Sequence, residues 1–60
     1  MSNPIAIARL EARGSRLMAR DIRAQADGIV IDSAKAASMY DLARDYAARA
    51  ATIEMLLANA

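Results

Sequence analysis

Five arginines recur through the first half of the chain at intervals of three and four residues, and they carry its clearest chemical signal. They are Arg9, Arg13, Arg16, Arg20 and Arg23. At 3.6 residues per turn these positions cover about 80° of one helix face. Like charges four residues apart mildly destabilise a helix, so a purely solvated face would be built more easily from mixed charges. This arginine stripe is therefore a candidate partner-binding surface.

Three interpretations of the arginine stripe remain open. It could be a solvated face, with arginine used for its helix propensity. It could contact an acidic protein surface, since the guanidinium fork pairs bidentately with carboxylates; the neighbouring Asp41 and Asp45 of another copy would be one such surface. It could follow a nucleic-acid backbone. The net charge of only +1, and the lack of Asn, Gln or aromatic residues among the arginines, argue against the nucleic-acid backbone. The acidic protein surface is the preferred interpretation.

Catalytic chemistry finds little support in the sequence. There is no Cys and no His, which removes thiolates, disulfides and the commonest zinc ligands. The two glycines stand alone and form no phosphate-binding loop. Asp41 and Asp45 supply too few oxygens for Ca²⁺, and Tyr46 is expected to fill a gap in a core. We expect no enzyme, no metal and no cofactor.

The elements that would position the arginine stripe are two helices. Sixteen of the 60 residues are Ala, and the one Pro stands at the start. Ser2 or Asn3 followed by Pro4 predicts the beginning of the first helix. Asp27 and Gly28 predict its end, with Gly28 in the left-handed conformation. This helix should cover residues 4–26.

The first helix should run through Gly14 without a break. A glycine in a helix costs about 1 kcal/mol relative to alanine, but the arginine stripe crosses Gly14 without a change of phase. A second helix should begin at Asp32 or Ser33 and cover residues 33–58. The prediction is an all-α, antiparallel two-helix hairpin that forms a single domain.

A helix-packing seam can be read on each helix from apolar residues spaced alternately three and four apart. The seam predicted for the first helix is Ile7, Leu10, Gly14 and Leu17, continuing through Asp21 and Ala24. The seam predicted for the second helix is Ala36, Met39, Ala43, Tyr46, Ala50, Ile53 and Leu57. Small residues alternating with large ones should let the helices approach closely, with the large side chains filling the gaps.

One hairpin is not expected to hide all the apolar surface. The apolar arc of the first helix spans about 200°, whereas a helix facing one neighbour needs a stripe that starts near 100°. A 60-residue chain also buries only a modest share of its surface, so association would add stability. In length and topology the chain resembles Rop, a helical hairpin that dimerises into a four-helix bundle. No sequence motif is shared, so the resemblance assigns no residue roles.

The connection between the helices contains Ile29, Val30 and Ile31, which suit a buried site. They could cap the open end of the hairpin core, or pack against the same residues of a second chain. Residues 1–26 carry a charge of +3 and residues 27–60 a charge of −2, so two copies could complement each other.

The sequence as a whole predicts a homodimer or larger oligomer that acts as an adaptor, inhibitor or assembly subunit. A Rop-like nucleic-acid regulator and a structural subunit of a larger particle are the alternatives. Charges interrupt every window long enough to span a membrane, and no secretory signal is visible, so we expect a cytoplasmic protein. Short Ala- and Arg-rich chains of this kind are typical of bacterial and phage accessory proteins.

Overall fold

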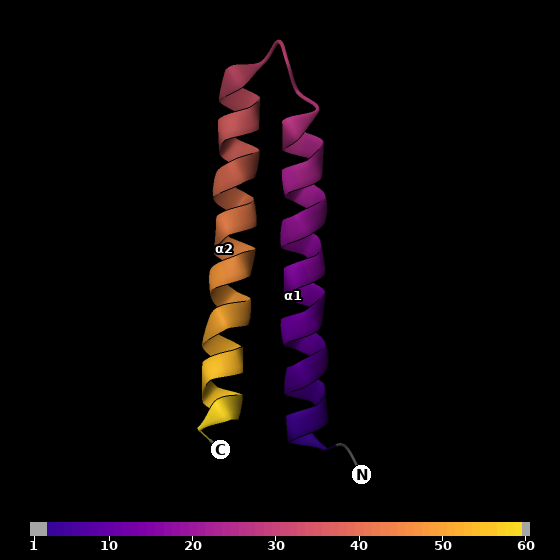
Figure 1. Cartoon of the computed structure of the whole chain (residues 1–60), viewed down its shortest axis with the longest axis vertical. Coiled ribbons are helices and arrows are strands. Elements are labelled where there is room, and N and C mark those ends of the chain that lie inside the picture. The colour runs from indigo at the N-terminus through magenta and orange to yellow at the C-terminus, as the bar shows by residue number, and fades with distance from the viewer. Residues whose placement is uncertain (1–2, 60) are drawn as a thin grey trace.

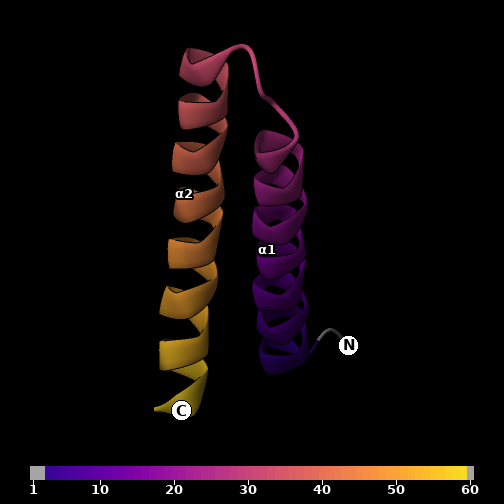
Figure 2. The ribbon, with the colours of Figure 1, turned by 45° about the horizontal axis from the view of Figure 1, so that its top comes forward.

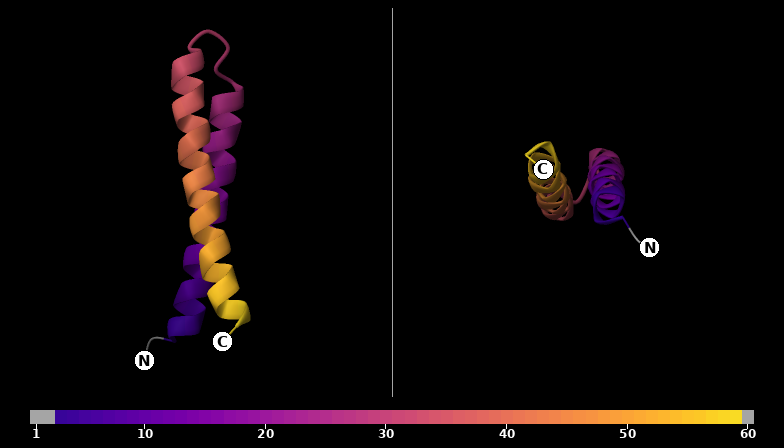
Figure 3. Two further views of the ribbon diagram at one scale, coloured as in Figure 1. Left: turned by 90° about the vertical axis from the view of Figure 1, so that its left-hand side faces the viewer. Right: turned by 90° about the horizontal axis from the view of Figure 1, so that it is seen from below.

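Two long α-helices and a short connection make up residues 3–59, the part of the chain that the computed structural model describes (Figure 1). Helix α1 spans Pro4–Asp27 and helix α2 spans Ser33–Ala58. They run antiparallel along one another and cross at a shallow angle (Figures 2 and 3). The predicted all-α hairpin is confirmed, and α1 continues through Gly14 without interruption.

The N-terminal ends of both helices follow from side-chain capping. Asn3 precedes α1, and its side-chain oxygen accepts hydrogen bonds from the backbone nitrogens of Ile5 at 3.0 Å and Ala6 at 3.4 Å. Pro4 is the first helical residue, where its missing N–H leaves no bond unmade. Ser2, the alternative cap, lies outside the described residues. Asp32 caps α2 by accepting from the nitrogen of Lys35 at 2.9 Å.

The end of α1 differs from the prediction. Gly28 was expected in the left-handed conformation, but its φ of −80° and ψ of −10° are right-handed. The reason is that the last turn tightens. The nitrogens of Gly28 and Ile29 donate to the carbonyls of Gln25 and Ala26 at 3.1 and 3.0 Å. These bonds satisfy carbonyl groups at the end of α1 that a left-handed Gly28 would otherwise help to satisfy.

The apolar connection is covered only at its first residue. Ile29 is half-buried at the end of the hairpin. Val30 and Ile31 are 90% and 98% exposed. The interpretation in which all three residues cap the core of one hairpin therefore applies to Ile29 alone.

The contact between the helices is made mainly of alanine. Among the described residues, those classed as buried are Ala12, Ser15, Ala26, Ala36, Ala43 and Ala50. On α2 the predicted seam does face α1, because Ala36, Ala43 and Ala50 are buried. The larger Met39, Tyr46, Ile53 and Leu57 of that seam are half-buried beside them.

The seam predicted for α1 is wrong within the hairpin. Ile7, Leu10 and Leu17 are 51%, 67% and 47% exposed. Gly14 is exposed too, and a Cβ added to it would meet no atom within 4 Å. The residues of α1 that face α2 are Ala8, Ala12, Ser15, Ala19, Ile22 and Ala26.

Side-chain size explains the difference. The large residues of the α2 seam already fill the space beside the contact, so α1 must present small side chains for the helices to approach. The face from Ala8 to Ala26 is almost entirely small, whereas the predicted face would set Ile7, Leu10 and Leu17 against Met39, Tyr46 and Ile53. The face of α1 with small side chains is therefore buried, and the face with large side chains is exposed to solvent.

Candidate functional site

The arginine stripe borders a groove between the two helices. Arg16, Arg20 and Arg23 of α1 line it together with residues of α2. The α2 residues are Tyr40, Ala43, Arg44 and Ala47. The groove has a volume of about 430 Å³ and is open to solvent. Because the spacing of four and three residues places these arginines on one side of α1, they line the groove in succession.

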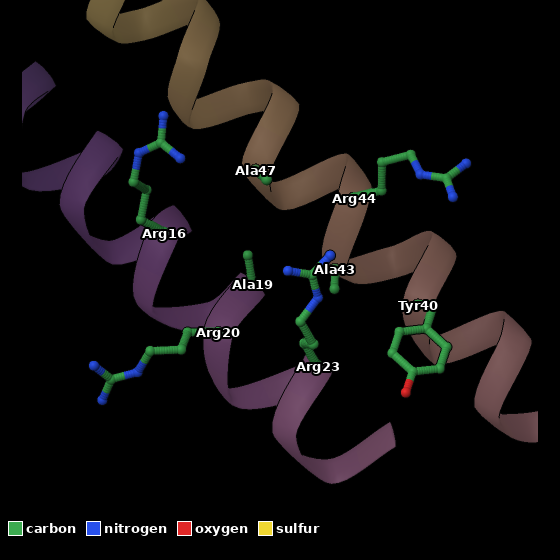
Figure 4. Close-up of a pocket in the computed structure, with 8 residues that line it drawn as sticks. All are labelled: Arg16, Ala19, Arg20, Arg23, Tyr40, Ala43, Arg44 and Ala47. Atoms are coloured by element: carbon green, nitrogen blue, oxygen red, sulfur yellow. The ribbon is translucent and has the colours of Figure 1, made fainter. Parts of the chain in front are cut away.

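Small side chains make the groove hollow. Ala19 of α1 and Ala43 and Ala47 of α2 form its floor (Figure 4). Their methyl groups leave room above the contact that longer side chains would fill. Arg23 reaches over Ala43 between the helices, whereas Arg20 and Arg44 point outward on opposite rims (Figure 4). We call this feature the arginine groove.

One arginine of the groove is already paired. Arg16 Nε donates to both carboxylate oxygens of Glu54, at 3.1 and 3.0 Å, and its Nη2 also bonds Glu54 Oε1. These hydrogen bonds, aided by charge attraction, raise the pKa of Arg16 and lower the pKa of Glu54. Both side chains remain about half exposed, so water screens the pair. It joins α1 to α2 at one end of the groove.

Tyr40 forms the opposite end of the groove. Its hydroxyl donates to Asp27 Oδ1, which orients the ring. This hydrogen bond, desolvation and the Asp27 charge raise the pKa of Tyr40, and the nearby Arg23 opposes the shift. Tyr40 therefore lines the same groove as Arg23, with its hydroxyl held by Asp27.

The remaining arginines of the groove are open to a partner. No carboxylate among the described residues lies within 4.0 Å of Arg20 or Arg23. Arg44 approaches Asp41 at 3.9 Å, with both side chains more than 70% exposed, a contact of little energetic weight. The groove therefore carries three cations available to an external anion.

The stripe does not act as one unit. Arg9 and Arg13 lie further toward the N-terminus, beside a shallow depression of about 510 Å³ that Ala6 and Leu10 also line. The five arginines thus divide into three that border the groove and two that do not. Sequence reasoning missed Tyr40 and Arg44, although their spacing of four, continued by Ala47, is the signal of a shared α2 face.

The charged groups of the groove are suited to pairing with anions. Guanidinium groups pair bidentately with carboxylates or phosphates and do not deprotonate near neutral pH. Among residues 3–59, no cluster of three or more acidic side chains could hold a metal ion. Neither helix described is long and apolar enough to cross a membrane.

Comparison with other proteins assigns no family. The chain matches no protein-family model, no curated protein and no solved structure.

Proposed function

We propose that this chain is a non-catalytic helical binding protein that self-associates and presents its arginine groove to an acidic protein surface. It would serve as an adaptor, an inhibitor or an assembly subunit. The observation that carries the proposal is the arrangement of Arg20, Arg23 and Arg44 around a hollow, alanine-floored groove. The guanidinium groups of Arg20 and Arg23 have no carboxylate partner within the described chain.

The size of the groove favours a short acidic segment. Arg16 and Arg23 are two helical turns apart, about 10 Å along α1. Glu54 and Asp27 occupy the two ends with carboxylates of the chain itself. Between them is room for acidic side chains on successive turns of a partner helix, which lie about 5–6 Å apart. Such carboxylates match the spacing of Arg20 and Arg23 along α1.

A nucleic-acid backbone fits the groove less well. Proteins that follow a duplex backbone make about 6–10 phosphate contacts, whereas the groove offers three available arginines. One observation does favour nucleic acid: Tyr40 and Arg23 line the same groove, and aromatic rings stack on bases. The hydroxyl of Tyr40 is engaged by Asp27, however, and no second aromatic ring accompanies it in the groove.

Fluorescence anisotropy would test the proposal. The labelled probes are a helical peptide with glutamates at alternating intervals of three and four, single-stranded RNA, and duplex DNA, each at about 50 and 200 mM salt. The acidic peptide is expected to bind more tightly than either nucleic acid. A steep fall in nucleic-acid affinity between the two salt concentrations, with weak peptide binding, would instead favour the backbone-binding function.

A matched pair of variants separates the groove from overall charge. Arg20→Ala with Arg23→Ala removes two charges inside the groove, and Arg9→Ala with Arg13→Ala removes two outside it. Only the first pair should abolish peptide binding while the helical content is kept. Equal weakening of peptide binding by both pairs would show that the peptide is attracted by overall charge and not held in the groove. Dissociation of the oligomer by the first pair would make the groove an assembly contact, and the proposal of an external partner would fail.

A further inference from the structure

The broad side of the hairpin opposite the arginine groove is marked by a second ion pair, between Arg49 Nη2 and Glu11 Oε1 at 3.6 Å. Glu11 and Arg16 are five residues apart, about 140° around α1, so their ion pairs lie on opposite broad sides. Residues three, four or seven positions from Glu11 or Arg49 share the side of this pair. On this side, here called the apolar side, lie Ile7, Met18, Leu42, Tyr46, Ile53 and Leu56.

The apolar side holds side chains that one chain does not cover. Ile7, Met18, Leu42 and Leu56 are 51%, 46%, 47% and 67% exposed. The described residues include no large side chain that is fully buried, because those classed as buried between the helices are alanine and serine. Exposed apolar patches of this extent mark interaction sites on soluble proteins.

We infer that the occupant of the apolar side is a second copy of this chain. Two hairpins then pack face to face as a four-helix bundle, related by a two-fold axis parallel to their length, with both connections at one end. This arrangement rests on the self-association proposed above and adds its face and direction. The hairpin measures 48 by 20 Å across this side. The side therefore approaches the roughly 800 Å² per partner of a stable interface.

Charge selects the relative direction of the two copies. On the apolar side α1 contributes the acidic Glu11, and α2 contributes the basic Lys35 and Arg49. Asp21 and Asp45 are each two residues, about 160° around the helix, from Ala19 and Ala43, which face the other helix. They therefore point toward the outer edges of α1 and α2, although Asp45 is four residues from Arg49. A two-fold axis along the hairpin sets α1 over the partner's α2, so that each Glu11 lies between Arg49 of its own chain and the partner's Arg49.

The end-for-end arrangement lacks this complementarity. It sets each helix over its own copy, and Arg49 lies about 5 Å from the middle of α2. The two Arg49 side chains would then lie about 10 Å apart along the axis, and the two Glu11 side chains would also be on facing helices. The parallel arrangement in addition brings the exposed Val30 and Ile31 of both chains to the same end of the bundle.

Sedimentation equilibrium with two variants tests the interface. The wild-type chain is expected at twice its monomer mass. Leu42→Glu places a charge on the apolar side and should shift the dissociation constant upward by at least tenfold. Met55→Glu is the control, because Met55 is 64% exposed and lies away from that side. It should leave the dimer intact. A monomeric wild-type chain, a larger oligomer, or equal effects of both variants would overturn the inference.

A distance measurement tests the direction with a substitution in the exposed connection, which leaves the side chains of the apolar side unchanged. Because the chain has no cysteine, Val30→Cys can carry a single spin label on an exposed site. Double electron–electron resonance should give an intermolecular distance of roughly 20 Å, about two interhelix spacings. A distance near the 48 Å length of the hairpin would overturn the parallel arrangement. Anisotropy with the acidic peptide reports on the groove separately, so a failure of the groove and a failure of this interface are distinguishable.

Discussion

Replacing Gly14 with alanine should stabilise the protein. If Gly14 lay between α1 and α2, as the predicted seam implies, the same change would destabilise it. Gly14 has no positive φ, lies in the interior of α1, and would present a Cβ to open space. Alanine therefore gains helix propensity and restricts the unfolded chain without a steric cost. These effects together amount to about 0.5–1 kcal/mol.

Urea and thermal unfolding followed by circular dichroism would measure this gain. For a chain of this size, 1 kcal/mol raises the Tm by roughly 4–8 °C. The titrations are run at several protein concentrations, because association contributes to the apparent stability. Ala24→Gly is the mirror control, since Ala24 is also exposed in α1 and should lose a similar amount. Gly14 is three residues from Glu11 and therefore lies on the apolar side. If Gly14→Ala lowered the stability, its backbone would have to be in close contact with a helix of a second copy, and the absence of a steric cost would be refuted.

Three further predictions follow from the described contacts. Ala50→Leu overfills a fully buried site and should destabilise by about 1–3 kcal/mol in urea unfolding, whereas the exposed Ala48→Leu should have little effect; equal effects would contradict the alanine contact. Because the hydrogen bonds from Arg16 lower the pKa of Glu54, the pair contributes stability above the ordinary pKa near 4.5 and loses it as pH falls through the folded value. Glu54→Gln should therefore flatten the acid limb of a stability-against-pH curve, and an unchanged limb would refute the pair. Asn3→Ala removes the cap of α1 and should cost about 1 kcal/mol, with Asn3→Asp retaining most of the stability in the same titration.

The helix boundaries could be predicted from sequence because short-range chemistry sets them. Asn3 and Pro4 begin α1, and Asp32 begins α2, through bonds within a few residues. The prediction of 4–26 for the first helix missed only Asp27. The conformation of Gly28 could not be derived in the same way, because two alternative sets of bonds can satisfy the last carbonyls of a helix.

The face of α1 that meets α2 could not be predicted from the sequence of α1 alone. Two runs of α1 alternate between spacings of three and four residues, and their members are one or two positions apart. One begins at Ile7 with a spacing of three, and the other begins at Ala8 with a spacing of four. Hydrophobicity alone favours the run with larger side chains. The choice is made by the space that α2 leaves, which depends on how Met39 and Tyr46 pack.

The arginine groove was predictable on one helix only. The stripe follows from the period of α1, which placed Arg16, Arg20 and Arg23 on one side before any partner helix was known. Tyr40 and Arg44 join them because of the rotation of α2 about its own axis against α1. That rotation follows from the packing of the two helix faces that meet, and the prediction for the face of α1 was wrong.

The alanine contact also has a consequence for the heat capacity of unfolding. Globular proteins gain about 12–15 cal/mol/K per residue on unfolding because large apolar surfaces become hydrated. Unfolding of a single hairpin newly exposes mainly alanine methyl groups, since the large side chains already contact water in the folded hairpin. Folded alone, it should have a small heat-capacity change and a flat stability curve with little tendency to cold-denature. Covering the apolar side would restore the usual curvature of stability against temperature. The shape of that curve therefore measures how much apolar surface the chain buries only when it associates.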